Sequence, residues 1–240
     1  MMDKFTDIAG IIFDYGGTID TNGKHWAEVL WNKYQEFNVP VSKEAFREAY
    51  IFGERTLAMK PLIKAEHNFK DVLFIKVGLQ LSYLVEKGFL SNENDETDSY
   101  RELISESCYA FVKETLETTR PVVERLSAQH KLVLVSNFYG NIETILKDFS
   151  LLCFFKEIIE SSVVGVRKPD PAIFELGVKA IGAKPMNIVV VGDSFSKDMI
   201  PAKKAGCKVV WLKGEGWGEE TDDSLPDRII SDLKDLVLLF

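Results

Sequence analysis

The sequence is poor in the residues that form disulfide frameworks and zinc sites. It holds three cysteines and three histidines in 240 residues, and the cysteines are far apart with no CxxC pair. An odd number of widely spaced cysteines indicates neither a disulfide framework nor a thiolate metal site. The isolated histidines likewise lack the spacing of metal ligands. We expect the cysteines to be buried, small apolar residues. They are Cys108, Cys153 and Cys207.

An excess of basic residues and long apolar runs are also missing. The formal charge of −8 leaves no basic stripe for a phosphate backbone, which disfavours nucleic acid as a partner. No apolar run approaches the length of a membrane span, and residues 1–5 lack the basic and apolar segments of a signal peptide. We therefore expect a cytoplasmic monomer or homodimer that binds a small molecule, not a membrane.

The two ends of the chain differ from its middle in apolar pattern. A short apolar run, Ile8 to Phe13, ends at Asp14 and predicts a buried strand followed by a tight loop. From about Trp26 to Val112 the period becomes helical, with little clustering of β-branched residues. The predicted helices of this stretch are Ala27–Phe37, Lys43–Arg55, Phe69–Glu86 and Ser99–Lys113.

The second half of the chain alternates short apolar strands with helices. The change comes after Arg120, where Pro121 suits the first turn of a helix. Such alternation predicts a parallel sheet with helices on both faces. The predicted strands are Leu132–Val135, Glu157–Glu160, Ile188–Val191 and Lys208–Trp211, and the predicted helices are Asn141–Lys147, Pro171–Ala180 and Lys197–Ala205.

These patterns together predict an α/β protein. Its core is a three-layer, Rossmann-like, doubly wound parallel sheet formed by residues 1–20 and 115–240. An all-helical cap domain, residues 21–114, is inserted between the two core segments. Ligands of such sheets bind beyond the carboxyl ends of the strands, so polar residues at those ends are the candidates for a site.

Polar residues follow three of the predicted strands. Asp14 follows the first, Ser136 and Asn137 follow the second, and Asp193 follows Ile188–Val191. Lys168, between Arg167 and Pro169, adds a cation. Two carboxylates, a hydroxyl and an ammonium suit a hard divalent cation together with a phosphoryl group.

In order along the chain, these segments resemble the four motifs of the haloacid dehalogenase (HAD) superfamily. A single aspartate after a strand is weak evidence, but four motifs in order and at suitable spacing form a strong signal. The helical insert after the first motif resembles the cap of these enzymes. The motifs are Phe13-Asp14-Tyr15-Gly16-Gly17-Thr18, Val133-Leu134-Val135-Ser136-Asn137, Arg167-Lys168-Pro169-Asp170-Pro171, and Gly192-Asp193-Ser194 with Asp198.

The resemblance implies a Mg²⁺-dependent hydrolase that acts on a small phosphorylated metabolite. Asp14 would attack phosphorus and form an aspartyl-phosphate that water hydrolyses. Mg²⁺ would bind Asp14, Asp193 and the backbone carbonyl of Gly16. The cation would offset the repulsion between a carboxylate and a phosphate dianion.

The resemblance also implies the groups that hold the phosphate. Ser136 and Lys168 would act in catalysis and bind the phosphoryl oxygens, and Asn137 and Gly17 would help to bind them. Thr18, Ser194 and Asp198 would support these residues. Asp198 would orient Lys168 or a metal-bound water, and its alternative role is to stabilise the first turn of a helix. For Asp20, capping of the helix that begins the insert is the preferred interpretation.

The sequence departs from the phosphatase pattern at Gly16. Most phosphatases of this superfamily have a second aspartate there, which acts as general acid and base, and its loss costs on the order of 10²–10⁴-fold in rate. We favour a slow or specialised phosphatase. The alternatives are a protein that binds a phosphometabolite without catalysis, and an enzyme similar to phosphonoacetaldehyde hydrolases in which Lys64 forms a Schiff base.

A 2-haloacid dehalogenase is a further alternative, because those enzymes also lack the second aspartate. They use no metal, so the retention of Asp193 disfavours this interpretation. Tyr15 is one position earlier than the tyrosine of the dehalogenases, and we expect it to pack near the cap hinge. Substrate choice is expected to come from the cap and from the residues after Ser136. The candidates are His25, Trp26, Arg55, Lys60, Lys64, Phe138 and Tyr139.

Overall fold

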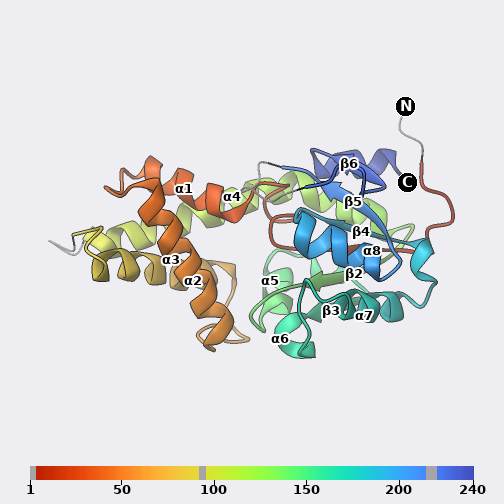
Figure 1. The fold of residues 1–240 in the computed structure, drawn as a ribbon, viewed down its shortest axis with the longest axis horizontal. Coiled ribbons are helices and arrows are strands. Elements are labelled where there is room, and N and C mark those ends of the chain that lie inside the picture. The colour runs from red at the N-terminus through yellow and green to blue at the C-terminus, as the bar shows by residue number, and fades with distance from the viewer. Residues whose placement is uncertain (1–3, 92–95, 215–220) are drawn as a thin grey trace.

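A computed structural model describes residues 4–91, 96–214 and 221–240. It consists of a helix-flanked sheet and a lobe of helices that extends to one side of it (Figure 1). The lobe lies at the left of the figure, and the C-terminus lies at the sheet. The helices of the lobe are α1 (Trp26–Glu36), α2 (Lys43–Met59), α3 (Phe69–Glu86) and α4 (Glu96–Ser127).

The sheet has six strands, and every neighbouring pair is parallel. Their spatial order is β3-β2-β1-β4-β5-β6, so the first strand lies in the interior of the sheet between β2 and β4. This confirms the predicted α/β class. The strands are β1 (Gly10–Phe13), β2 (Lys131–Ser136), β3 (Glu157–Glu160), β4 (Ile188–Gly192), β5 (Lys208–Leu212) and β6 (Arg228–Ile230).

Helices cover both faces of the sheet, as predicted. They include α5 (Ile142–Asp148), α6 (Ser161–Val164), α7 (Ala172–Ile181), α8 (Ile200–Lys204), the 3₁₀ helices η2 (Leu152–Phe154), η3 (Pro185–Asn187) and η5 (Leu233–Leu238), and a π-helical turn, η4 (Phe195–Met199). Successive residues of a strand face opposite sides. Ile11 and Phe13 accordingly join a cluster with α4, α5 and η5, whereas Ile12 joins a second cluster with α7 and α8.

Helix α4 joins the lobe to the sheet without a break. It runs across the predicted domain boundary at residue 115, so that boundary stays a prediction. Our expectation that Pro121 begins a helix was wrong, because Pro121 lies inside α4. Buried residues on both sides of it, such as Leu116 and Val123, pack into the core, and this packing outweighs the helix-breaking tendency of proline. Thr119 also ties α4 to the Ile19 carbonyl with a 2.8 Å hydrogen bond.

Helices α1, α2 and α3 of the lobe begin at side chains that cap them. Ser42 accepts a hydrogen bond from the backbone of Ala45 at the start of α2. Asn68 and Asp71 form a reciprocal capping box at the start of α3. Such caps contribute about 1 kcal/mol each and fix where a helix starts. Helix α3 packs against α2 and α4.

The cysteines are only partly as expected. Cys108 and Cys207 are buried, but Cys153 is exposed, so the prediction was wrong for that residue. Cys153 lies in the short 3₁₀ helix η2. The buried residues of this segment are Leu151 and Phe155, which flank the helix.

Among the described residues, no helix is both long enough and apolar enough to cross a membrane. Even α4, with 32 residues, has charged side chains along its length.

Candidate active site

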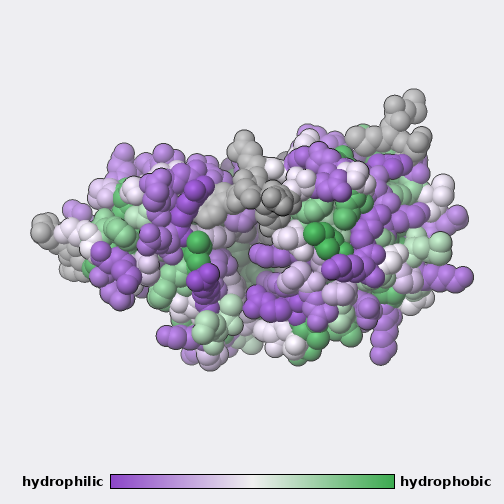
Figure 2. All heavy atoms as spheres, viewed as in Figure 1, coloured by the Kyte–Doolittle hydropathy of each residue, from purple (hydrophilic) through white to green (hydrophobic). Residues whose placement is uncertain are grey.

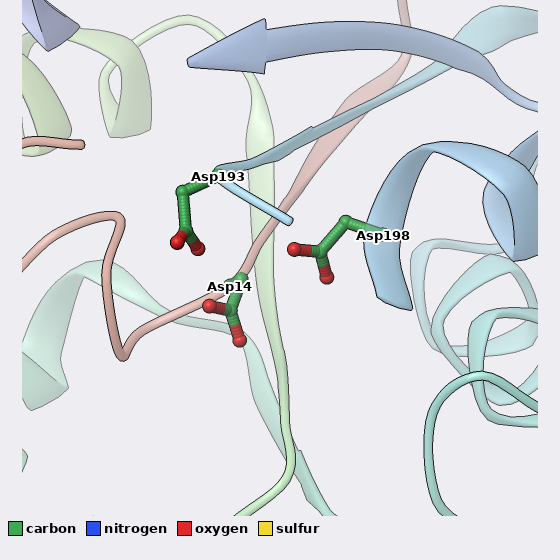
Figure 3. A group of neighbouring side chains, drawn as sticks. All are labelled: Asp14, Asp193 and Asp198. Atoms are coloured by element: carbon green, nitrogen blue, oxygen red, sulfur yellow. The ribbon is translucent and has the colours of Figure 1, made fainter. Parts of the chain in front are cut away.

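The topology of the sheet brings three of the predicted residues together. From β1 the chain adds β2 and β3 on one side and β4, β5 and β6 on the other, so the strand order reverses at β1. The carboxyl end of β1 is therefore a topological switch point, at which α/β proteins bind ligands. Asp14 follows β1, Ser136 ends β2 and Asp193 follows β4. Figure 3 shows the carboxylates of Asp14, Asp193 and Asp198 around one space.

Lys168 is held between two of these carboxylates. Its Nζ lies 2.6 Å from Asp14 Oδ1 and 2.6 Å from Asp198 Oδ1. Burial opposes the charge of this lysine, but Asp14 and Asp198 raise its pKa above the usual value, so it stays an ammonium. Asn137 fixes the backbone of Lys168 from both sides, because its amide donates to the Lys168 carbonyl at 3.0 Å and accepts from the Lys168 N–H at 2.9 Å.

Two hydroxyl groups contact the acidic cluster. Ser136 Oγ donates to Asp14 Oδ1 at 3.2 Å. Thr18 Oγ1 lies 3.2 Å from Asp193 Oδ1 and 3.4 Å from Asp14 Oδ2. The first hydroxyl lies on the Lys168 side of Asp14, and the second joins Asp14 to Asp193. The Asp14 carboxylate is therefore positioned by partners on both oxygens.

The donor set fits a hard divalent cation. Asp14, Asp193 and Asp198 each offer a carboxylate oxygen, and these oxygens lie within 4.8 Å of one another. Burial, with Asp14 and Asp198 nearby, raises the pKa of Asp193 well above its usual value. Among the salt bridges between described residues, none reaches Asp193. Closely spaced carboxylates without a matching cation repel one another, and a bound dication would remove that repulsion.

Asp198 is already engaged by other groups. One of its oxygens accepts from Lys168, and the other accepts the backbone N–H of Ser194 at 3.1 Å. Burial raises the pKa of Asp198 to about 6, although Lys168 opposes this shift. Ser194 in turn caps the turn η4 by accepting from the Lys197 N–H. Asp198 is thus placed to orient Lys168, which is one of the two roles weighed from the sequence.

Asp20 has a different place from the one predicted. It does not cap the first helix of the lobe, because His25 is the residue that caps α1. Instead, Asp20 accepts the backbone N–H of Gly17 at 2.7 Å and the indole N–H of Trp26 at 2.8 Å. The chain turns back on itself after β1, which buries the Asp20 side chain completely. Burial raises the pKa of Asp20 to about 7.

A cavity of about 1180 Å³ lies over this cluster. Figure 2 shows that the surface is hollowed between the lobe and the sheet. The lobe contributes the wall opposite the strand ends, so a ligand here would touch both parts of the chain. The residues from the sheet that line it include Asp14, Gly16, Gly17, Ser136, Asn137, Lys168, Asp193, Ser194 and Asp198.

Comparison with protein families identifies the chain. The family model of haloacid dehalogenase-like hydrolases matches residues 8–206, which include strands β1 to β4 and the helical lobe. The chain belongs to this family. It is a HAD-like hydrolase, as the order of its four motifs predicted.

The related proteins of this HAD-like hydrolase include phosphatases. It is 28% identical over 238 residues to glyceraldehyde 3-phosphate phosphatase of Methanothermobacter thermautotrophicus, covering 95% of this chain and 98% of the relative. It is 29% identical over 236 residues to phosphoglycolate phosphatase of Mannheimia succiniciproducens, covering 94% and 95%. Haloacid dehalogenase-like hydrolase domain-containing protein 3 of Danio rerio is 33% identical over 103 residues, and there the match spans only 43% of each chain.

Solved structures share the fold of the HAD-like hydrolase. A dehalogenase with an intermediate complex matches with a TM-score of 0.64 at 17% identity, covering 100% of this chain and 99% of the other. A HAD-hydrolase of Bacillus subtilis bound to magnesium matches with a TM-score of 0.58 at 18% identity, covering 97% and 98%. Both matches support the sheet with its inserted helices.

The structure separates the residues that the sequence suggested for the cap. His25, Trp26, Arg55 and Lys60 line the cavity, as do Phe138 and Tyr139. Lys64 does not line it and is exposed on the surface. Tyr15 is also absent from the cavity wall. It is buried with its ring edge-on to Phe69 and Phe138, which agrees with the expected packing near the hinge.

Several charged residues of the cavity wall were missed or misplaced from the sequence. Asp20, Glu54 and Lys76 are among them. For Lys76 a signal was present, because it shares the apolar stripe of α3 with Phe69, Val72 and Val77 and is buried like them. A lysine on the buried face of a helix needs a partner. Glu54 had no comparable signal, because its position depends on how α2 packs against α3.

Proposed function

We propose that this HAD-like hydrolase is a phosphatase that acts on a small phosphorylated metabolite in the cytoplasm. One observation carries the proposal: Asp14 lies on the cavity floor with Lys168 2.6 Å and Ser136 3.2 Å from the same oxygen. A carboxylate held beside an ammonium and a hydroxyl can attack a group that carries negative oxygens, because those partners also bind that group.

In the proposed reaction Asp14 acts as the nucleophile. A carboxylate oxygen forms a bond to phosphorus as the bond to the leaving oxygen breaks, which gives an aspartyl-phosphate and an alcohol after proton uptake. Water then attacks phosphorus, restores Asp14 and releases inorganic phosphate. Lys168, Ser136 and the backbone N–H of Asn137 would bind the phosphoryl oxygens in both steps. Gly17 donates its N–H to Asp20 in this structure, so it would bind a phosphoryl oxygen only after giving up that hydrogen bond.

Mg²⁺ is the cofactor we propose for the acidic cluster. Asp14, Asp193 and the carbonyl of Gly16 would hold it, because hard oxygen ligands suit this ion. When bound, it supplies positive charge that lets an anionic nucleophile approach an anionic phosphate. Asp198 would stay with Lys168 and keep that ammonium aimed at Asp14.

The glycine at residue 16 should limit the rate of phosphate release. Without a carboxylate there, no group at that position protonates the leaving oxygen or activates water. The enzyme should therefore turn over esters with good leaving groups faster than alkyl esters. The phosphatase names of two long-matching relatives support the reaction class, but they refer to two different substrates.

The alternatives have less support. Schiff-base chemistry at Lys64 is disfavoured by its exposed position outside the cavity. A dehalogenase would not need the acidic side chain of Asp193 beside Asp14. Binding without catalysis keeps the same contacts and differs only in turnover, so it is decided by experiment.

The proposal is tested by phosphate release from p-nitrophenyl phosphate, an ester with a good leaving group. We expect turnover that requires Mg²⁺ and that falls at least 10³-fold in Asp14→Asn, since the amide cannot act as the nucleophile. Asp7→Asn, a change of the same kind at an exposed residue that does not line the cavity, serves as the control. Tight binding of phosphate without any turnover would contradict the proposal and favour a binding protein.

A further inference from the structure

The helical lobe places a second ion pair in the cavity, away from the acidic cluster. Lys76 on α3 lies with its Nζ 2.7 Å from Oε1 of Glu54 on α2. Both residues line the cavity that Asp14 also lines. The Lys76 side chain is only 10% exposed and that of Glu54 34% exposed. The pair therefore forms part of the cavity wall and differs from a fully exposed surface salt bridge.

Tyr139 joins the pair to the sheet, and Trp26 of α1 lies beside it in the lobe. Tyr139, which follows β2, donates its hydroxyl to Oε2 of Glu54 at 3.4 Å. The ammonium of Lys76 lies 5.9 Å from the ring centre of Tyr139 and 5.9 Å from that of Trp26. Burial opposes the charge of Lys76, but Glu54 with Tyr139 and Tyr50 raises its pKa well above the usual value. The wall therefore carries one positive and one negative charge.

The cavity wall formed by Lys76 and Glu54 suits a different chemical group from the end of the cavity at Asp14, where the phosphate is proposed to bind. An ammonium has three donors and a carboxylate accepts several hydrogen bonds, so the pair offers both kinds of partner side by side. A carboxylate or second phosphate placed here would be attracted by Lys76 and repelled by Glu54. A hydroxyl group can donate to Glu54 and accept from Lys76 without either conflict.

We propose that Lys76 and Glu54 bind the hydroxyl groups of an uncharged substrate tail, and that the substrates are monophosphates of sugars or polyols. This inference rests on the proposed function, because it assumes that the phosphate lies at Asp14. The cavity volume of about 1180 Å³ leaves room for several carbon atoms beyond the phosphate. Monophosphates with an anionic tail, such as phosphoglycolate, are disfavoured by Glu54.

Binding calorimetry tests the inference without the need for turnover. The chain carrying Asp14→Asn is titrated, with Mg²⁺ present, with sorbitol 6-phosphate and with phosphoglycolate. We expect sorbitol 6-phosphate to bind at least tenfold more tightly. Adding Glu54→Gln should raise the affinity for phosphoglycolate about tenfold, because Lys76 is then free to pair with its carboxylate. Tighter binding of phosphoglycolate before that change, or an unchanged ratio after it, overturns the inference.

Two further variants serve as a control and as a replacement for Glu54→Gln. Glu28→Gln changes the same charge in an ion pair of the lobe, 3.0 Å from Lys43, that does not line the cavity, and it should leave the ratio unchanged. Glu54→Gln alone leaves a buried lysine without its carboxylate, which destabilises proteins. If that variant fails to fold, the double variant Glu54→Gln with Lys76→Gln replaces it and should abolish the preference. A preference that persists in the double variant overturns the inference.

Failure of the inference and failure of the proposed function give different results. Turnover of p-nitrophenyl phosphate by the unaltered chain reports on Asp14 and depends little on a tail. Turnover without a preference for sorbitol 6-phosphate rejects only the role of the ion pair. A preference in binding without any turnover rejects only the phosphatase. Absence of binding by either ligand together with absence of turnover rejects both.

Discussion

A Cβ atom placed on Gly17 would lie 2.6 Å from Oδ1 of Asp193. The backbone of Gly17 also has a positive φ of 95°, a conformation that residues with side chains rarely adopt. The loop after β1 can therefore approach Asp193 only if residue 17 is glycine. At Gly16 the situation is the reverse, because a Cβ there would meet nothing within 4 Å.

The open space at Gly16 leads to the first prediction. Gly16→Asp should fit without displacing its neighbours, and its carboxyl group would enter the cavity that Gly16 lines. We expect the rate of hydrolysis of an alkyl phosphate to rise by roughly 10²–10⁴-fold, the contribution of a general acid or base. The measurement is kcat for an alkyl phosphate and for p-nitrophenyl phosphate, and the gain should be larger for the alkyl ester, whose leaving group needs the proton.

Gly17→Ala is the matched control for that experiment. The added methyl group would collide with the Asp193 carboxylate, so activity should fall and not rise. If Gly16→Asp folds normally but leaves the alkyl phosphate rate unchanged, a missing proton donor is not what limits the enzyme.

Asp193→Asn tests the acidic cluster through stability. In the absence of metal, burial raises the pKa of Asp193, and the nearby charges of Asp14 and Asp198 raise it further. Removing its charge should stabilise the metal-free protein by on the order of 1 kcal/mol, seen as a higher Tm in EDTA. The same variant should lose most of the rise in Tm that Mg²⁺ gives to the unaltered chain, because binding to the native state alone stabilises it.

The two halves of that result depend on different physical causes. A higher Tm in EDTA reports on repulsion between carboxylates, and the lost response to Mg²⁺ reports on a ligand. If Asp193→Asn keeps the full response to Mg²⁺, the cation binds elsewhere and the proposed ligand set is wrong.

Much of the site could be predicted because its residues follow apolar strands that are recognisable in the sequence. Asp14, Ser136 and Asp193 each follow an apolar strand, and parallel strands bring their carboxyl ends to one edge. The strand order could not be deduced from such patterns alone. Lys168 does not directly follow a predicted strand, and its segment Arg167-Lys168-Pro169 is a source of positive charge that also resembles the third motif. The structure places these residues within reach of one another, while their catalytic roles remain predictions.

The residues that escaped prediction depend on contacts between distant segments. Glu54 meets Lys76 because α2 packs against α3, and Asp20 is buried because its loop folds back under Gly17. Helix α4 continues through Pro121 because its buried side chains pack on both sides of that residue. In each case the local signal was overruled by packing that a pattern within one segment does not contain.

Lys64→Ala separates the phosphatase from Schiff-base chemistry. Lys64 is exposed and does not line the cavity, so its loss should change kcat/KM for p-nitrophenyl phosphate less than twofold. Borohydride treatment in the presence of phosphonoacetaldehyde should not label this residue. Specific labelling of Lys64 that requires phosphonoacetaldehyde would revive the alternative and show that the cap can move this segment over Asp14.

Asp20 should give the protein a recognisable dependence of stability on pH. Burial raises the pKa of Asp20 from an ordinary value near 4 to about 7 in the folded state. Between these values the native state holds a proton that the unfolded state has lost. The stabilising contribution of the protonated carboxyl is therefore complete below about pH 4 and is lost as the pH rises through about 7.

Asp20→Asn removes this titration, so the stability of the unaltered chain relative to the variant should fall as the pH rises from 4 to 7. The expected slope is at most about 1.4 kcal/mol per pH unit. Urea unfolding in EDTA at pH 4.5, 5.5 and 6.5 measures it, with Asp7→Asn as the control, since Asp7 is exposed and asparagine also tolerates its positive φ of 60°. A difference between unaltered chain and Asp20→Asn that is constant over this range would mean that the buried carboxyl is ionised throughout. In that case the hydrogen bonds from Gly17 and Trp26 compensate for the loss of water around Asp20.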